Sequence, residues 1–347
     1  MERQSGRRSF SRREFLGMAA AGGLSVTLLG GCGGASSGGG GASSGGGGQA
    51  KAKKNYRLVL IVGVLGDEFY TTMGCGASAE ANKLGVDLKI QGPKDFDPSE
   101  QTPILNAAIQ SSPDAILIAP TDKTAMIAPI QSAVNQGIPV IAVDTTINKP
   151  DILLAHIGSD NFKGGQVAGN ALAKAINKKG KVFVVNVKPG ISTTDARQKG
   201  FEAAIKKYPG IQYLGAQYDN DDPTKAASIT SAVLQKNPDL AGIFGTNIYA
   251  GEGAATGVRQ AGKKGQVKII EFDASPTEVK DLKKRSVDGL IAQHPGDIGR
   301  LGVKMAVDYL DTKKKPQQKN VTTGFTVVTR ENMNDPNVSK YLYKAQC

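Results

Sequence analysis

The feature that most constrains the fold is a regular alternation of short apolar runs with helix-like segments, which starts near Tyr56 and continues to about residue 310. Runs such as 115–119 and 139–143 are continuously apolar and end in turn residues. Such runs are typical of parallel strands whose two faces are both covered by helices. The sequence therefore predicts an α/β fold with doubly wound parallel sheets.

The alternation occurs as two series of similar size, the second of which starts near residue 160. The chain has 347 residues, which is more than one ordinary core requires. We therefore expect two doubly wound lobes, each with its own sheet.

The N-terminal segment predicts export and lipidation. A paired Arg12–Arg13 precedes an apolar stretch at 15–29, which is typical of a twin-arginine export signal. The stretch is shorter than the about 20 apolar residues of a membrane-spanning helix. It ends in Leu-Gly-Gly before Cys32, which resembles a bacterial lipobox, so residues 1–32 are expected to form a signal that leaves Cys32 lipidated. The alternative is an ordinary signal peptide with an unrelated cysteine.

Residues 33–54 contain two copies of Ala-Ser-Ser-Gly-Gly-Gly-Gly, at 35–41 and 42–48, and predict a flexible linker. A globular part on a linker below a lipid anchor would lie on the outer face of the cytoplasmic membrane or in the periplasm. The anchor is the only membrane contact that we expect.

Polar and aromatic side chains follow several of the predicted strands. In doubly wound folds ligands bind at the carboxyl ends of strands, so these positions are candidates for a binding site. They are Asp67, Phe69, Tyr70, Asp144, Asn247, Asp273 and Gln293. Carboxylates accept hydrogen bonds from hydroxyl groups, amides both donate and accept, and aromatic rings pack on the C–H faces of sugars. The set favours a small, neutral, polyhydroxylated ligand.

Other ligand classes are disfavoured. Neither a phosphate-binding P-loop nor a dinucleotide fingerprint follows the first strand, and no cofactor is expected. Cysteine and histidine are too few and too dispersed for a zinc site, so we predict no metal. The net charge is +12, but the lysines are scattered and no basic run is interleaved with aromatics. We therefore expect no nucleic-acid partner.

From about Tyr56 to Val328 the chain resembles the periplasmic ribose-binding-protein family, the type I sugar receptors of ABC importers, here in a lipoprotein form. The order and spacing of several segments carry the resemblance. These segments are Val64–Tyr70, Ala119–Asp122, Gly137–Ile141 with Asp144, Gly158–Asn161 with Gly164–Gly165, Arg197 before Gly200–Phe201, Asn247, Phe272–Asp273 and Ala292–Gln293.

The resemblance implies two lobes joined by a three-segment hinge, with the sugar clamped between them. It places the N-terminal lobe at 55–159 plus 294–322, and the C-terminal lobe and tail at 160–293 plus 323–347. The protein would be a monomer that is not an enzyme, and it would deliver a pentose, hexose or short polyol to an ABC importer permease.

The resemblance also assigns roles to individual residues. Phe69 and Tyr70 would stack on the sugar, and Asp67 stands where the family usually has an asparagine. Asp144 and Asp273 would accept hydroxyl protons. The expected donors are Arg197, Asn247 and Gln293. Two positions depart from the pattern of ribose binders. This chain has Thr145 where ribose binders have an arginine, and it has Asn220 near the position where they have an aromatic residue. We include both residues in the expected site, although the departures argue against ribose itself.

Several alternatives remain open. Asp67 could serve only as a helix cap, and His156 and His294 are expected to be structural. The closed form could be presented to a signalling receptor instead of a permease. Paired carboxylates also allow a sugar-acting enzyme, although no nucleophile–base signature is present. A transcriptional regulator of this fold would need an N-terminal helix-turn-helix, which the leader and linker replace.

Cys75 and Cys347 are the two thiols that remain if Cys32 is lipidated. An even number of cysteines in an exported protein suggests a disulfide, which would fix the C-terminal tail to the first helix. Two free thiols are the alternative.

Overall fold

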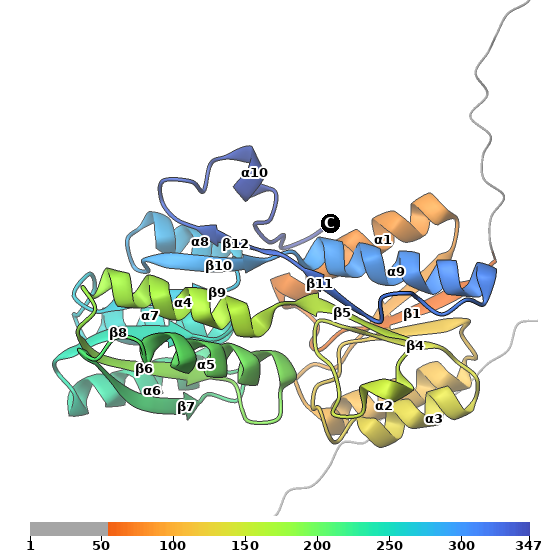
Figure 1. Cartoon of the computed structure of the whole chain (residues 1–347), viewed down its shortest axis with the longest axis horizontal. Helices are drawn as coiled ribbons and strands as arrows, with labels where there is room; N and C mark the ends of the chain where they lie inside the picture. The colour runs from red at the N-terminus through yellow and green to blue at the C-terminus, as the bar shows by residue number, and fades with distance from the viewer. Residues whose placement is uncertain (1–54) are drawn as a thin grey trace, which may run out of the picture. The chain divides into compact units, whose positions relative to one another are not determined.

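A computed structural model describes residues 55–347, so the leader, Cys32 and the linker lie outside the described residues. The described part contains two six-stranded sheets, one in each lobe, as Figure 1 shows. The strand order is β11-β5-β4-β3-β1-β2 in the N-terminal lobe and β12-β10-β9-β8-β6-β7 in the C-terminal lobe. These lobes confirm the expected two-lobed, doubly wound α/β class.

Continuous apolar runs form the central strands because helices cover both faces of each sheet. Every residue of Ala115–Ile118 and of Val140–Val143 is buried. The strands of the N-terminal lobe are β1 (Arg57–Ile61), β2 (Asp87–Gln91), β3 (Ala115–Ile118), β4 (Val140–Val143), β5 (Ala155–Ser159) and β11 (Asn320–Thr323). Its helices are α1 (Glu68–Leu84), α2 (Pro98–Gln110), α3 (Ile127–Asn135), the short 3₁₀ helix η1 (Pro150–Ile152) and α9 (Pro295–Thr312).

The C-terminal lobe repeats this construction and adds one antiparallel edge strand. Its strands are β6 (Gly180–Asn186), β7 (Ile211–Tyr218), β8 (Leu240–Gly245), β9 (Lys268–Phe272), β10 (Gly289–Gln293) and β12 (Phe325–Val328). Its helices are α4 (Asn161–Ala175), α5 (Ser192–Ile205), α6 (Pro223–Lys236), α7 (Ile248–Gln260), α8 (Pro276–Lys283) and α10 (Pro336–Ser339). Strand β12 pairs antiparallel with β10, so this sheet is mixed and not wholly parallel.

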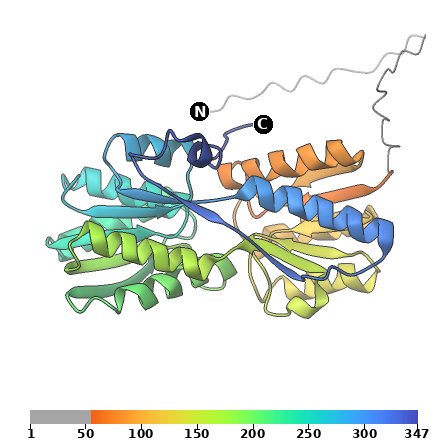
Figure 2. The same cartoon turned by 45° about the horizontal axis from the view of Figure 1, so that its top comes forward.

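The chain passes between the lobes three times, from β5 to α4, from β10 to α9 and from β11 to β12 (Figures 1 and 2). All three crossings leave strands at one edge of each sheet, whereas β2 and β7 form the opposite edges. The third crossing lies at Gly324, because β11 extends to Thr323, one residue beyond the expected boundary. The hinge therefore lies at one edge of both sheets.

Helix α1 is fixed at both ends and along one face. Asp67 caps its N-terminus, and Gly85 ends it in the left-handed conformation at φ 69°. A side chain at Gly76 would collide with the carbonyl of Gly296, so α1 and α9 pack almost backbone to backbone. This contact sets the position of the first turn of α1, which carries Phe69 and Tyr70.

The C-terminal tail returns to α1. A disulfide joins Cys347 to Cys75, with 5.4 Å between their Cα atoms. The amide of Tyr343 donates to the carbonyl of Ala274 at 3.0 Å, and the amide of Lys344 donates to the Thr72 hydroxyl at 2.8 Å. The tail thus contacts both lobes beside the hinge. Among residues 55–347, no helix is long and apolar enough to cross a membrane.

Two interacting glutamates are buried in the C-terminal lobe, Glu271 on β9 and Glu278 on α8. Both carboxylate oxygens of Glu271 and the Oε1 atom of Glu278 are buried without a hydrogen-bond partner. Burial raises the pKa of Glu271 well above its usual range, and the charges of Asp281 and Glu252 raise it further. Burial and the charge of Glu271 likewise raise the pKa of Glu278. Protons retained on both carboxyl groups therefore explain how they tolerate burial.

We predict that this pair makes the protein less stable in alkali. The unfolded chain releases these protons above about pH 4.5, the ordinary glutamate pKa, whereas the folded chain retains them. The free energy of unfolding must therefore fall as pH rises through that range. Glu271→Gln should raise the melting temperature by roughly 2–6 °C at pH 8 and by less at pH 5. Differential scanning calorimetry measures both values. The exposed Glu331→Gln is the matched control, and equal shifts at the two pH values would contradict the prediction.

Candidate functional site

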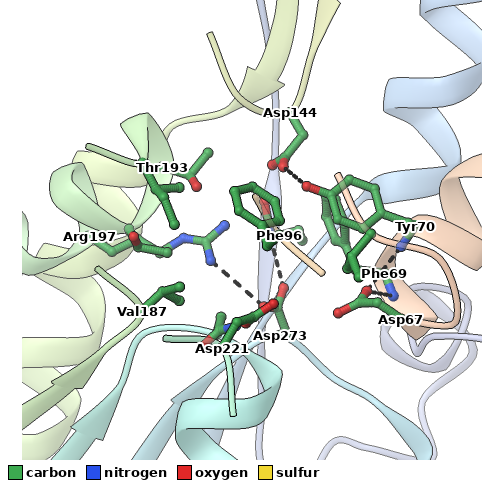
Figure 3. Close-up of a pocket in the computed structure, with 15 residues that line it drawn as sticks. Asp67, Phe69, Tyr70, Phe96, Asp144, Val187, Thr193, Arg197, Asp221 and Asp273 are labelled. Atoms are coloured by element: carbon green, nitrogen blue, oxygen red, sulfur yellow. Dashed lines mark hydrogen bonds and ion pairs between the residues drawn. The ribbon is translucent and has the colours of Figure 1, made fainter. Parts of the chain in front are cut away.

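Side chains from both lobes meet in one pocket at the carboxyl ends of the strands (Figure 3). We call it the ligand pocket. Residues from the N-terminal lobe approach from one side, and residues from the C-terminal lobe approach from the other. Its lining is Val64, Asp67, Phe69, Tyr70, Phe96, Asp144, Val187, Ile191, Thr193, Thr194, Arg197, Asp221, Asn247, Asp273 and Gln293.

The first turn of α1 supplies an aromatic wall. Asp67 is buried, and its Oδ1 atom accepts hydrogen bonds from the amides of Phe69 at 2.7 Å and Tyr70 at 3.2 Å. The two rings meet edge to face, with 5.1 Å between their centroids. The Tyr70 hydroxyl donates to Asp144 Oδ2 at 2.9 Å. Asp67 therefore caps the helix and also lines the pocket.

Asp144 and Asp273 are the residues directly after β4 and β9, and both adopt left-handed backbone conformations, with φ 61° and 96°. Non-glycine residues rarely adopt positive φ, and such strain is concentrated at functional sites. Both aspartates are buried. In the N-terminal lobe the ring Nε2 of His156 lies 3.0 Å from the Asp144 carbonyl and helps to hold this turn.

Arg197 is the only cation that lines the ligand pocket. Its Nε donates to Asn161 Oδ1 at 2.9 Å and its Nη1 donates to the Thr246 carbonyl at 2.8 Å. The Nη1 atom also lies 3.7 Å from Asp273 Oδ2. The guanidinium stacks on the Phe272 ring at 3.8 Å. These contacts orient one charged donor toward the centre of the pocket.

Two further hydrogen-bonded pairs complete the wall from the C-terminal lobe. Asn247 caps α7, and its amide donates to Asp221 Oδ1 at 2.7 Å. The amide of Gln293 donates to Asp273 Oδ1 at 2.7 Å. The hydroxyl of Tyr343 donates to the same oxygen at 2.7 Å, so the C-terminal tail helps to position Asp273. Gln293 Oε1 is buried and has no hydrogen-bond partner.

Four carboxylates and one guanidinium share this space, and three of the carboxylates are hard to ionise. Burial raises the pKa of Asp67 well above its usual range, and the charges of Asp221 and Asp273 add to this effect. Burial also raises the pKa of Asp144 to about 6, although Arg197 and Tyr70 oppose it. The pKa of Asp221 is about 6 for the same main reason, with the Asn247 amide opposing. Hydroxyl donors in the pocket would stabilise the ionised forms.

The structure brings eight of the ten expected residues to the ligand pocket. They are Asp67, Phe69, Tyr70, Asp144, Arg197, Asn247, Asp273 and Gln293. Thr145 does not line the pocket, because its buried hydroxyl donates to the Pro120 carbonyl at 2.7 Å. Asn220 is exposed and lies outside the pocket, since the left-handed turn at Asn220 and Asp221 directs the next residue, Asp221, inward instead.

Sequence reasoning missed Phe96, Asp221, Thr193 and Thr194. Phe96 supplies a third aromatic ring from the loop after β2. Phe96 could have been predicted from the sequence because it follows a strand, and the same strand-end rule identified Asp144. The two threonines lie in the first turn of α5, where no such signal exists.

Three groups of contacts hold the lobes together in front of the pocket. Lys123 Nζ lies 2.5 Å from Asp195 Oδ2, and the amide of Lys123 donates to the Gly190 carbonyl at 2.9 Å. The amide of Thr146 donates to the Ser192 hydroxyl at 2.9 Å. Lys188 Nζ donates to the Phe96 carbonyl at 2.8 Å and lies 3.7 Å from Asp97. We call these contacts the lobe bridges.

Neither histidine lines the ligand pocket. His294 stacks on Tyr341 at 3.4 Å between ring centroids, and its Nε2 lies 2.9 Å from the Thr326 hydroxyl. Within residues 55–347, no cluster of histidine, cysteine and acidic residues is arranged to hold a metal ion.

Comparison with known protein families and sequences gives a consistent result. Residues 58–315 match the model of a periplasmic binding protein domain. The ribose import binding protein RbsB of Bacillus subtilis is 30% identical over 279 residues, which cover 80% of this chain and 89% of that protein. The D-ribose/D-allose-binding protein of Pseudomonas aeruginosa is also 30% identical, over 294 residues, with coverage of 81% and 91%.

Solved structures agree with these relatives. An ABC transporter solute-binding protein of Agrobacterium vitis, bound to α-D-tagatopyranose, superposes with a TM-score of 0.82 and 45% identity. The match covers 84% of this chain and all of that one. A carbohydrate transporter solute-binding protein of Agrobacterium radiobacter, in complex with D-arabinose, gives a TM-score of 0.79 and 27% identity, with coverage of 83% and 99%.

The lobe bridges lead to a prediction about the protein without ligand. Lys123 and Lys188 are partly exposed, so each bridge should contribute about 1 kcal/mol or less. The double variant Lys123→Met, Lys188→Met should therefore shift the equilibrium toward separated lobes by roughly 5- to 30-fold. Spin labels at Gln110→Cys and Lys236→Cys, on the exposed ends of α2 and α6, would report the distance by pulsed electron resonance. Lys181→Met removes an ion pair within one lobe and is the control; identical distributions in variant and control would overturn the prediction.

Proposed function

The chain belongs to the periplasmic binding protein domain family, and we propose that it captures one small neutral sugar or polyol between its lobes and delivers it to an ABC importer permease. Proteins of this family bind and transport solutes, and they act outside the cytoplasm. The family is not an enzyme family. The pocket is lined by residues of both lobes, which supports this proposal.

One observation carries the proposal most directly. Asp144 Oδ1 and Gln293 Oε1 are buried hydrogen-bond acceptors with no partner in the protein, and both line the ligand pocket. One comes from the N-terminal lobe and the other from the end of β10. An unpaired buried acceptor costs about 1–3 kcal/mol, so a ligand that supplies two hydroxyl donors would relieve this cost in both lobes at once.

The remaining lining suits the same ligand. Phe69, Tyr70 and Phe96 provide aromatic faces and edges for the C–H groups of a ring. Arg197 provides charged donors for ring or hydroxyl oxygens. Because ligand contacts would come from both lobes, binding would favour the closed arrangement over an open one.

The relatives suggest which sugars to test first. The tagatopyranose-bound neighbour is 45% identical to this chain, another neighbour is bound to D-arabinose, and one relative is named for D-ribose and D-allose. Thr145 and Asn220 lie outside the ligand pocket, so their departure from the ribose pattern does not decide between sugars. Because of the 45% identity, a ketohexose in its pyranose form is our leading candidate, with aldohexoses, pentoses and pentitols next.

We further propose that the protein is anchored by a lipid on Cys32 and acts as a monomer. The lipobox-like Leu-Gly-Gly-Cys and the linker that follows support the anchor. A linker rich in glycine would let the lobes reach a permease while the anchor stays in the membrane.

A thermal-shift panel on residues 51–347 tests the proposed function. D-tagatose, D-allose, D-ribose, D-arabinose, D-fucose, pentitols and tetritols should be compared. A sugar present at 100 times its Kd should stabilise the protein by about 2.7 kcal/mol, which corresponds to roughly 5–10 °C. Asp144→Ala and Asp273→Ala should abolish the shift, whereas Asp239→Ala, on the surface, should keep it. No shift with any compound would refute the proposal.

The anchor has its own test. The full-length chain, expressed in a bacterium that lipidates exported proteins, should incorporate radiolabelled palmitate and partition into the detergent phase. Cys32→Ser should lose both properties, because no other acylation site is proposed, and Cys75→Ser is the control. Labelling that persists in Cys32→Ser would contradict lipidation at this residue.

A further inference from the structure

A second hollow lies directly outside the ligand pocket, and we call it the mouth groove. Its volume is about 570 Å³, which falls within the range of small-molecule sites. Both lobes contribute to it. The residues that matter here are Leu65, Phe96, Asp219, Asp221 and Tyr249.

The groove lies at the entrance of the cleft. It is lined by the loops that follow β2 and β7, which are the edge strands opposite the three hinge crossings. Lobes that rotate about the hinge separate most at this edge. Any part of a ligand that extends beyond the ligand pocket in this direction would therefore reach the groove.

The groove and the ligand pocket share part of their walls. Val64, Phe96 and Asp221 line both. Phe96 is half-buried, and the C-terminal lobe holds its loop through the hydrogen bond from Lys188. The two spaces are therefore adjacent, and the Phe96 ring and the Asp221 carboxylate lie at their shared boundary.

The wall of the groove has the chemistry of a sugar subsite. Asp219 is fully buried, and its Oδ2 atom has no hydrogen-bond partner, whereas Oδ1 accepts from the Asp221 amide at 2.8 Å. Tyr249 on α7 is half-buried and also lines the groove. An acceptor without a partner and an aromatic side chain in one groove are the combination that recognises a hydroxylated ring.

We propose that the mouth groove is a second subsite, which binds the second sugar ring of a short glycoside whose first ring fills the ligand pocket. Asp219 would accept a hydroxyl of that second ring, and Tyr249 would pack against it. The proposal rests on the proposed function, since the first ring must bind in the ligand pocket. It widens the ligand class from free monosaccharides to disaccharides.

Paired glycosides test the subsite. The probes are the methyl and the glucosyl glycosides, in both anomeric forms, of D-tagatose, D-ribose, D-arabinose and D-allose. Titration calorimetry should find at least one glucosyl glycoside that binds about tenfold tighter than its methyl counterpart, a difference of about 1.4 kcal/mol. Tyr249→Ala and Asp219→Asn should each remove most of that gain and change the Kd of the parent monosaccharide less than twofold.

The controls separate this proposal from the one on which it rests. Tyr208→Ala removes a tyrosine elsewhere on the same lobe and should leave the gain intact. If monosaccharides bind but no glucosyl glycoside binds tighter than its methyl counterpart, the second subsite is wrong and the proposed function stands. If Tyr249→Ala weakens monosaccharides and glycosides equally, its role is structural and the subsite is wrong. If no monosaccharide binds, both proposals fail.

Discussion

The buried guanidinium of Arg197 is the contact on which the rest of the site depends. Moving such a charge out of water costs several kcal/mol and is tolerated only when hydrogen bonds and an opposite charge surround it. Asn161, the Thr246 carbonyl and Asp273 meet this need, and the Phe272 ring covers one face. A side chain at Gly165 would strike the Arg197 carbonyl, so the packing of α4 on α5 fixes the same residue. The position of Arg197 therefore links the packing of the helices, the charge in the pocket and the orientation of Asp273.

Each lobe alone carries half of a binding site. The N-terminal lobe holds the aromatic wall and the unpaired acceptor of Asp144, and the C-terminal lobe holds the guanidinium and two of the four carboxylates. The lobe bridges are partly exposed and individually weak, so they select the geometry of closure without supplying much of its energy. The balance between open and closed forms then depends on what lies between the lobes. That is the property a transport receptor needs if its permease is to distinguish loaded from empty protein.

Much of this arrangement could be read from the sequence because it depends on local rules. Apolar runs located most central strands, and the strand-end rule located Asp144 and Asp273. Strands β5, β11 and β12 were not anticipated, because polar residues such as His156, Thr322 and Thr326 interrupt their apolar runs. Phe96 and Asp221 belong to edge loops whose direction is set by lobe closure and by a left-handed turn. Thr145 was wrongly placed at the ligand because position in the chain does not reveal that its hydroxyl bonds to Pro120. The sequence thus predicted the fold better than it predicted which residues line the ligand pocket.

The C-terminal tail forms a fourth connection between the lobes, which is closed by a disulfide. Tyr343 is held by the C-terminal lobe through Ala274 and Asp273, and Cys347 is bonded to Cys75 on α1 of the N-terminal lobe. Only Lys344, Ala345 and Gln346 lie between them, and the four extended steps from Tyr343 to Cys347 span at most about 14 Å. The tail therefore acts as a tether of fixed length that limits how wide the cleft can open. The disulfide between Cys75 and Cys347 would then set the largest distance by which the lobes can separate, whether or not a sugar is bound.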